Sequence, residues 1–259
     1  MSSATLSAKL PSWFKQNIPD PQKIQAVKEI LSIAQVSTVC TSARCPNLGT
    51  CWQNRIATMM ILGDVCSRAC RFCAVKTGQP IAVDPAEPEK VARVVRELGL
   101  RYVVVTSVTR DDLPDGGAEH FAATMHAIRR RVPEVKIEIL IPDFQGEREN
   151  VEMVITAKPD VLAHNVETVA RLSRAVRPAA DYERSLAVLR LAKQLSPDLL
   201  TKSGIMVGMG ETDAEIFSAM ADLRRAGCDI LTIGQYLSPG ERTRHLPVTR
   251  FVSPGKFDE

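Results

Sequence analysis

Short apolar runs alternate with longer amphipathic stretches from residue 59 onward. The runs are rich in β-branched side chains and have the length of strands; they cover 59–65, 102–107, 136–141, 160–164, 202–207 and 229–233. Between them, apolar residues recur every three or four positions, as on one face of a helix, over 88–98, 118–131, 147–157, 181–195 and 212–226. Strands that alternate with helices are expected to pair in parallel through right-handed crossovers.

Six such strand–helix units are too few for a complete eight-unit (β/α) barrel. They fit a partial barrel or an open doubly wound sheet, and in both folds ligands bind at the carboxyl ends of the strands. Upstream, Asp20 and Pro21 predict the start of a helix, and the breakers within 40–58 predict a loop. We expect no separate second domain, only an extension over 1–58 ahead of a barrel segment at 59–259.

Composition and charge exclude several classes of protein. The 33 basic residues are nearly balanced by 30 acidic ones, and aromatic residues make up 5% of the chain. A nucleic-acid binder usually combines a concentrated basic surface with aromatic side chains for stacking, so no nucleic-acid partner is expected. No apolar run is long enough to cross a membrane, and the first residues lack the apolar core of a secretory signal. We therefore predict a cytoplasmic protein without a membrane partner.

The candidate chemistry is concentrated in the cysteines. Six of the seven form two triads, with the spacings Cys40-x4-Cys45-x5-Cys51 and Cys66-x3-Cys70-x2-Cys73. In a cytoplasmic protein such clustering indicates metal binding rather than disulfides. Structural zinc sites usually pair two CxxC knuckles or add closely spaced histidines, and these triads do neither. Three thiolates suit a cubane cluster that keeps one iron open, so iron–sulfur clusters are favoured, with zinc as the alternative.

The second triad is expected at the catalytic end of the sheet. Cys66 is predicted to end the first strand, and Cys70 and Cys73 follow in the next loop, where (β/α) barrels carry their catalytic groups. The segment reads CSRACRFC, with Phe72 directly before the last cysteine. This pattern resembles the signature of the radical S-adenosylmethionine (SAM) superfamily. The resemblance implies that this triad is catalytic, because it would hold the 4Fe–4S cluster that binds and cleaves SAM. It also implies a partial (β/α)6 barrel.

Further segments resemble the lipoyl synthase family within that superfamily. They are the first triad in its context CTSARCPNLGTCW, TSVTRDDLPDGG at 106–117, HNVET at 164–168 and GIMVGMGET at 204–212. The resemblance implies insertion of sulfur at carbons 6 and 8 of a protein-bound octanoyl group. It also implies that Cys40, Cys45 and Cys51 hold a second, auxiliary 4Fe–4S cluster, which donates the sulfur. Family members close that cluster with a serine in a C-terminal Arg-Ser motif. Ser238 and Ser253 lack this context, so the C-terminal segment is expected to be shortened and the fourth ligand stays open.

The resemblance implies partners as well. The substrate would be an octanoylated lipoyl-carrier domain or the glycine-cleavage carrier protein. Electrons would come from a donor such as ferredoxin or flavodoxin, and an iron–sulfur carrier would rebuild the auxiliary cluster. Two alternatives are a radical SAM methylthiotransferase, for which an additional RNA-binding domain would be expected, and a non-catalytic binding module stabilised by zinc.

Six residues are candidate SAM contacts by the same resemblance: Gly116, Gly117, Asn165, Glu167, Arg177 and Met206. The two glycines would let the backbone approach the methionine amino group, since no Cβ stands in the way. The asparagine and glutamate would meet the ribose hydroxyls and the carboxylate, the arginine would pair with the carboxylate, and the methionine would lie against the adenine. Each residue also has a simpler interpretation. The glycines would form a plain turn before a helix, the asparagine, glutamate and arginine would be exposed polar side chains, and the methionine would belong to the core. His164 is expected to pack at a strand end.

Overall fold

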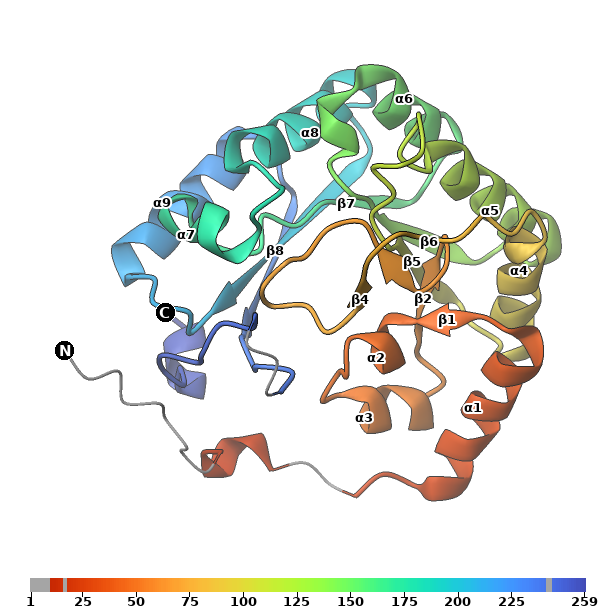
Figure 1. The fold of residues 1–259 in the computed structure, drawn as a ribbon, viewed down its shortest axis with the longest axis horizontal. Helices are drawn as coiled ribbons and strands as arrows, with labels where there is room; N and C mark the ends of the chain where they lie inside the picture. The colour runs from red at the N-terminus through yellow and green to blue at the C-terminus, as the bar shows by residue number, and fades with distance from the viewer. Residues whose placement is uncertain (1–9, 16–17, 241–243) are drawn as a thin grey trace.

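The computed structural model describes residues 10–15, 18–240 and 244–259 (Figure 1). Within this part of the chain, a seven-stranded sheet has the order β1-β2-β5-β6-β7-β8-β9. β1 (Ser37–Thr38) pairs antiparallel with β2, and every later pair of neighbours is parallel. The strands follow one another in chain order around a curved sheet that does not close, which is the arrangement of a partial barrel and not of a doubly wound sheet.

The alternating elements lie close to where the sequence predicts them. The strands are β2 (Thr58–Ile61), β5 (Tyr102–Ser107), β6 (Lys136–Leu140), β7 (Val161–Ala163), β8 (Leu200–Val207) and β9 (Ile230–Gln235). The helices, which cover the outside of the sheet in Figure 1, are α4 (Glu87–Glu97), α5 (Ala118–Arg131), α6 (Arg148–Thr156), α7 (Ala170–Val176), α8 (Tyr182–Leu195) and α9 (Asp213–Arg225). The sequence pattern misses only α7 among these. The described residues also form short 3-10 helices, namely η1 (Ser12–Phe14), η2 (Phe144–Gly146) and η3 (Pro254–Phe257).

Each outer helix buries one apolar face. Val91 and Val95 of α4 and Phe121, Met125 and Ile128 of α5 are fully buried. Removing a side chain of this size from water contributes about 1.5–3 kcal/mol, so these contacts fix the helices against the sheet and thereby the strand ends. No helix in the described part of the chain is long and apolar enough to cross a membrane.

The N-terminal region contains α1 (Pro21–Ala34), where the sequence predicts a helix. The Asp20 side chain accepts a hydrogen bond from the backbone N–H of Gln22, and proline occupies the first helical position. β1 then adds a strand to the edge of the sheet, so the predicted extension over 1–58 contacts the barrel directly. The division of the chain at residue 58 stays a prediction.

The loop predicted over 40–58 is wrong in part, because two short helices lie there. They are α2 (Val39–Ser42) and α3 (Leu48–Gln53). The Thr38 hydroxyl caps α2 by accepting from the Thr41 backbone N–H, a local hydrogen bond that the pattern of breakers does not reveal. The break between the helices coincides with Pro46, as expected.

Cys66 does not end the first strand of the alternating region, contrary to the prediction. β2 ends at Ile61, and Leu62 and Gly63 then adopt left-handed φ values of 68° and 93°, which a strand cannot continue through. Cys66 belongs instead to β3 (Val65–Cys66), which pairs in parallel with β4 (Lys76–Thr77) as a separate two-stranded sheet. The cysteine loop is therefore joined at its base by its own short sheet.

Candidate active site

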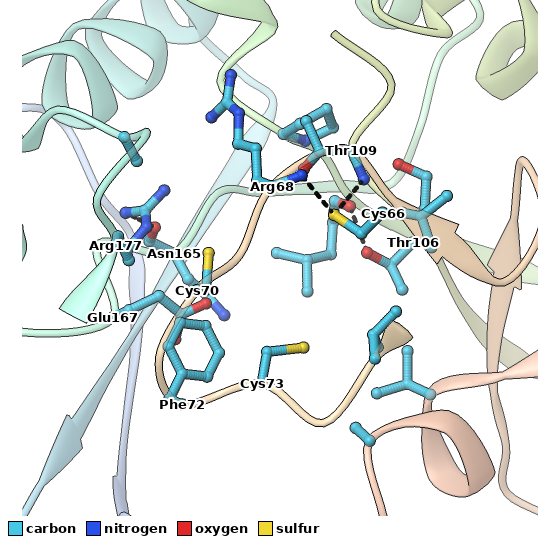
Figure 2. A pocket seen from close by; sticks show the side chains of 18 of the residues that line it. Cys66, Arg68, Cys70, Phe72, Cys73, Thr106, Thr109, Asn165, Glu167 and Arg177 are labelled. Carbon is cyan, nitrogen blue, oxygen red and sulfur yellow. Dashed lines mark hydrogen bonds between the residues drawn. The ribbon is translucent and has the colours of Figure 1, made fainter. Parts of the chain in front are cut away.

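A cavity of about 380 Å³ lies at the carboxyl ends of the strands. Cys66, Cys70 and Cys73 all line it, and their sulfur atoms point into the same open space (Figure 2). The cysteines come from the loop after β2, whereas the opposite walls come from the segments after β5, β6 and β7. The strand-end location predicted for the second triad is thus where the structure places it.

The donor set of this cavity fits a polynuclear cluster. Among the described residues, no three His, Cys, Asp or Glu side chains are arranged to hold a single metal ion. Three thiols line this cavity, and a 4Fe–4S cluster takes three thiolates while leaving one iron for another ligand.

The sulfur atoms of the second triad are largely buried, and backbone N–H groups face one of them. Cys66 Sγ accepts from the backbone N–H groups of Arg68, at 3.4 Å, and Thr109, at 3.3 Å (Figure 2). Burial raises the pKa of the Cys70 thiol to about 12, against the opposing effect of the Arg177 charge, and it also raises the pKa of Cys73. Free thiols of this kind stay protonated near neutral pH, and metal binding would release their protons.

A buried ion network braces the cysteine loop. Arg68 donates to both carboxylate oxygens of Asp111, at 2.7 and 2.8 Å, and to Asp143 at 2.7 Å. Arg184 reaches the other oxygen of Asp143 at 3.3 Å. Burial alone would raise the pKa of Asp143, but the hydrogen bond and charge of Arg68 outweigh it and hold that pKa at about 2. The sequence does not predict this network. The only feature that could have pointed to it is the position of Arg68 between Cys66 and Cys70.

Three of the predicted SAM contacts come together beside Cys70. Asn165, Glu167 and Arg177 all line the cavity (Figure 2). Arg177 Nη1 donates to the backbone carbonyls of Asn165, at 3.0 Å, and Val166, at 3.2 Å, so it supports the loop that carries the other two. Burial raises the pKa of Glu167, and the Arg177 charge works against that rise. Glu167 also has a left-handed φ of 66°, a costly conformation for this residue type.

The two glycines predicted to contact SAM do not line this cavity. Both have left-handed φ values, 61° at Gly116 and 92° at Gly117. A Cβ added to Gly117 would lie 2.3 Å from Leu62 Cδ1, and one on Gly116 would lie 2.9 Å from Phe144 Cδ1. Asp115 caps the turn by accepting from the N–H of Gly117. The turn into α5 therefore explains the glycines, and their contact with SAM stays a prediction.

Met206 and His164 are packed side chains. Met206 packs in a small apolar cluster with Phe72 and Tyr236 and is not among the residues that line the cavity, so its adenine contact stays a prediction. His164 is 2% exposed, its Nδ1 faces the Ile141 carbonyl at 2.9 Å, and burial lowers its pKa to about 4. The prediction that His164 packs at a strand end is confirmed.

The segment that carries the first triad contributes to the wall of the same cavity. Cys40 lies in α2 and Cys51 in α3, with Cys45 between the two helices. Burial raises the pKa of Cys51, and the neighbouring Cys40 and Cys45 raise it further, which places the three thiols within electrostatic reach of one another. Val39 and Ala43, on either side of Cys40, line the cavity of the second triad. The second triad thus lines the cavity directly, whereas Cys40, Cys45 and Cys51 are not among its lining residues and only neighbours of Cys40 reach its wall.

Comparisons with known proteins assign the chain. The model of the radical SAM superfamily matches residues 60–223. The lipoyl synthase of Rubrobacter xylanophilus is 56% identical over 247 residues, which cover 95% of this chain and 76% of that protein. The lipoyl synthase of Caldicellulosiruptor bescii is 53% identical, with 97% of this chain and 86% of that protein covered. The chain belongs to the lipoyl synthase family.

Two solved structures support the fold assigned to this lipoyl synthase family member. Methylornithine synthase has a TM-score of 0.60 at 15% identity, over 90% of this chain and 70% of its own. HydG, a maturase of the [FeFe]-hydrogenase, has a TM-score of 0.61 at 14% identity, over 91% of this chain and 61% of its own. At such identities the likeness shows the fold alone, and that fold is the partial barrel.

The family settles the cofactors. The enzyme uses SAM and two 4Fe–4S clusters, as the superfamily match and the lipoyl synthase relatives imply. Its six clustered cysteines supply two sets of three thiols, which agrees with that number of clusters. Neither the methylthiotransferase nor the zinc-stabilised binding module is favoured.

Proposed function

We propose that this enzyme inserts two sulfur atoms, at carbons 6 and 8, into a protein-bound octanoyl group and so forms a lipoyl group. The observation that carries the proposal is that one cysteine triad lines a cavity at the carboxyl ends of a partial barrel, and that the helix carrying Cys40 of the other triad contributes Val39 to its wall. When bound there, the clusters and SAM supply a 5′-deoxyadenosyl radical that removes hydrogen from unactivated carbons, and sulfide that replaces it.

The side chains around the cavity have separate roles in this proposal. Cys66, Cys70 and Cys73 would hold the cluster that works with SAM, and Cys40, Cys45 and Cys51 would hold the auxiliary cluster. Asn165 and Glu167 would bind SAM through its ribose hydroxyls and its carboxylate. Arg177 would pair with the SAM carboxylate while its Nη1 keeps the loop of Asn165 in place. Their common location beside Cys70 supports these roles.

The apolar part of the cavity suits an acyl chain. Its lining includes Val39, Met60, Val75, Val108, Leu140 and Ile141. Apolar walls would hold the octanoyl chain by burial and would exclude water from a reactive carbon radical. An octanoylated lipoyl-carrier domain or the glycine-cleavage carrier protein would deliver that chain. An electron donor such as ferredoxin or flavodoxin, and an iron–sulfur carrier that rebuilds the auxiliary cluster, would complete the cycle. Membership of the family supports these partners.

An anaerobic assay tests the proposal. The reconstituted enzyme is mixed with reductant, SAM and a carrier peptide that bears an octanoyl-lysine, and the peptide is analysed by mass spectrometry. We expect a product that has gained two sulfur atoms, together with 5′-deoxyadenosine. The matched control is the same peptide with a hexanoyl chain, which has no carbon 8 and should gain no dithiolane. Formation of 5′-deoxyadenosine from the octanoyl peptide without any sulfur-containing product would contradict the proposed reaction.

A further inference from the structure

Two short stretches after β9, Pro239–Gly240 and Arg244–Leu246, contact the segments that carry the two cysteine triads. The second stretch holds the triad that lines the cavity. Arg244 Nη2 donates to the backbone carbonyls of Cys73 and Val75, at 2.9 Å each, and Arg244 Nη1 donates to Thr77 Oγ1 at 2.8 Å. One guanidinium therefore fixes the chain from the last cysteine to β4.

The same stretch also holds the chain just before Cys73. The Leu246 N–H donates to the Arg71 carbonyl at 3.1 Å, and Arg71 Nε donates to the Arg244 carbonyl at 3.0 Å. Leu246 packs in the small apolar cluster that contains Phe72. Backbone, guanidinium and apolar contacts thus converge on the loop between Cys70 and β4.

The first stretch contacts the other triad through Arg44, which lies between Cys40 and Cys45. Arg44 Nη1 donates to the Pro239 carbonyl at 3.2 Å, although the two residues are 195 positions apart. A Cβ on Gly240 would approach the same nitrogen to 3.3 Å. Arg44 has a left-handed φ of 53°, which is unfavourable for a residue with a Cβ. The chain thus keeps an arginine in a conformation that suits glycine or asparagine, and this arginine reaches across to Pro239.

His245 joins the two stretches to each other. Its ring lies between two carbonyl oxygens, with Nδ1 3.2 Å from Gly240 O and Nε2 3.1 Å from Cys73 O. A continuous series of contacts therefore leads from Arg44, through Pro239, Gly240 and His245, to Cys73. It connects the loop of one triad with the loop of the other, and Cys73 at its end lines the cavity, as does Arg244.

We propose that Pro239–Gly240 and Arg244–Leu246 form an inter-triad brace, and that Arg44 and Arg244 are positioning residues that set the placement of the first triad relative to the second. The inference rests on the proposed function, in which a radical made at one cluster must meet sulfur held by the other. Reactions of this kind are sensitive to ångström-scale misplacement. A displaced first triad would leave SAM cleavage intact and let the substrate radical escape without receiving sulfur.

The test compares two matched glycine substitutions. Arg44→Gly removes the contact with Pro239 but suits the left-handed backbone. Arg55→Gly is the control, because Arg55 also has a left-handed φ, 56°, is exposed, and shows no side-chain partner among the described residues. With both clusters loaded, the ratio of 5′-deoxyadenosine formed to sulfur inserted is measured. We expect Arg44→Gly to raise this ratio about three- to tenfold and Arg55→Gly to leave it unchanged.

Arg244→Lys tests the other end of the brace, since lysine keeps the charge but cannot donate to several acceptors in one plane. Its control is Arg250→Lys, in the same C-terminal segment, where the arginine instead meets Asp213 at 3.0 Å. The ratio should rise for Arg244→Lys and stay at the wild-type value for Arg250→Lys. This variant keeps the inference testable should Arg44→Gly fail to load its clusters.

A second measurement does not depend on turnover. Pulsed electron paramagnetic resonance of the reduced clusters reports the spin relaxation that one cluster induces in the other, and this relaxation should change in Arg44→Gly but not in Arg55→Gly. If both Arg44→Gly and Arg244→Lys keep the wild-type ratio of 5′-deoxyadenosine to inserted sulfur and the wild-type spin relaxation, the brace is overturned. The proposed function would not be affected by that result. A wild-type enzyme that binds one cluster only, or that makes no sulfur-containing product, would instead remove the proposed function itself.

Discussion

Arg68 and Asp143 form a buried ion pair, with Arg68 Nη2 2.7 Å from Asp143 Oδ1. The carboxylate is not exposed at all and the guanidinium side chain is 6% exposed. Arg68 lies between Cys66 and Cys70, and Asp143 follows β6, so the pair ties the cluster loop to the end of a strand. The loss of Arg68 would leave the buried Asp143 carboxylate with only its longer, 3.3 Å contact to Arg184, and a poorly compensated buried charge is among the more costly results of one substitution.

Substitution of this arginine should destabilise the chain strongly. We expect Arg68→Met to lower the free energy of unfolding of the cluster-free protein by about 3–5 kcal/mol. Arg184→Met is the control, because Arg184 meets the same carboxylate at 3.3 Å but is 37% exposed, and such a pair contributes about 0–1 kcal/mol. Urea unfolding measures both. Equal losses in the two variants would contradict the assignment of Arg68 as the principal partner.

Acid should remove the contribution of this pair. The pKa of Asp143 is about 2 in the folded chain, against an ordinary value of 3.8. Because folding lowers this pKa, the stabilisation is fully present above about pH 4 and is lost as the pH falls toward about 2. Asp143→Asn should therefore be less stable than wild type near neutral pH and should lose less further stability across that acid range. Urea unfolding at a series of pH values checks this. If the free energy of unfolding falls equally steeply in acid for wild type and Asp143→Asn, the ion pair is not the source of the acid sensitivity.

Arg177 offers a test of the predicted SAM site. It lines the cavity, and its planar guanidinium already meets three acceptors, including Ser185 Oγ at 3.2 Å. We expect Arg177→Lys to weaken SAM binding by about tenfold or more, because an ammonium cannot reproduce a two-pronged pairing with a carboxylate. The control is Arg174→Lys, on the exposed face of α7. Anaerobic equilibrium dialysis gives both dissociation constants. An unchanged constant for Arg177→Lys would restrict Arg177 to supporting the loop.

Gly117 should tolerate no side chain. Its φ of 92° is left-handed, and a Cβ would lie 2.3 Å from Leu62 Cδ1. We expect Gly117→Ala to lower the free energy of unfolding by about 1–3 kcal/mol through backbone strain and overpacking. At Gly255 an added Cβ would meet nothing within 4 Å, so Gly255→Ala should be close to neutral in the same thermal or urea unfolding experiment. A neutral Gly117→Ala would show that the turn can adjust.

The sequence predicts the barrel because apolar residues recur with a different period in strands and in helices. The β-branched run at 102–107 coincides with β5, and the helical pattern at 118–131 coincides with α5. Elements set by a single local hydrogen bond were missed, such as α2, which depends on the Thr38 cap. β3 and β4 were missed as well, since strands of two residues show no alternation.

The candidate site divides in a similar way. Cysteine spacing predicts the two triads, because the proposed ligands of each cluster lie close together in the chain. Partners distant in sequence leave no such signal: Arg68 and Asp143 are 75 residues apart, and Arg244 lies 171 residues from Cys73. Gly116 and Gly117 show the opposite difficulty, since a turn before a helix and a cofactor contact require the same residue type.

The central claim is that the two triads have separate roles, and paired cysteine substitutions test it most directly. Cys66→Ala and Cys51→Ala are each assayed anaerobically with SAM, reductant and the octanoyl peptide, and 5′-deoxyadenosine and sulfur-containing product are measured together. Iron content should fall from about eight to about four per chain in both variants. We predict that Cys66→Ala forms neither product, whereas Cys51→Ala forms 5′-deoxyadenosine but no sulfur-containing product. Sulfur insertion by Cys51→Ala at the wild-type level would contradict the account.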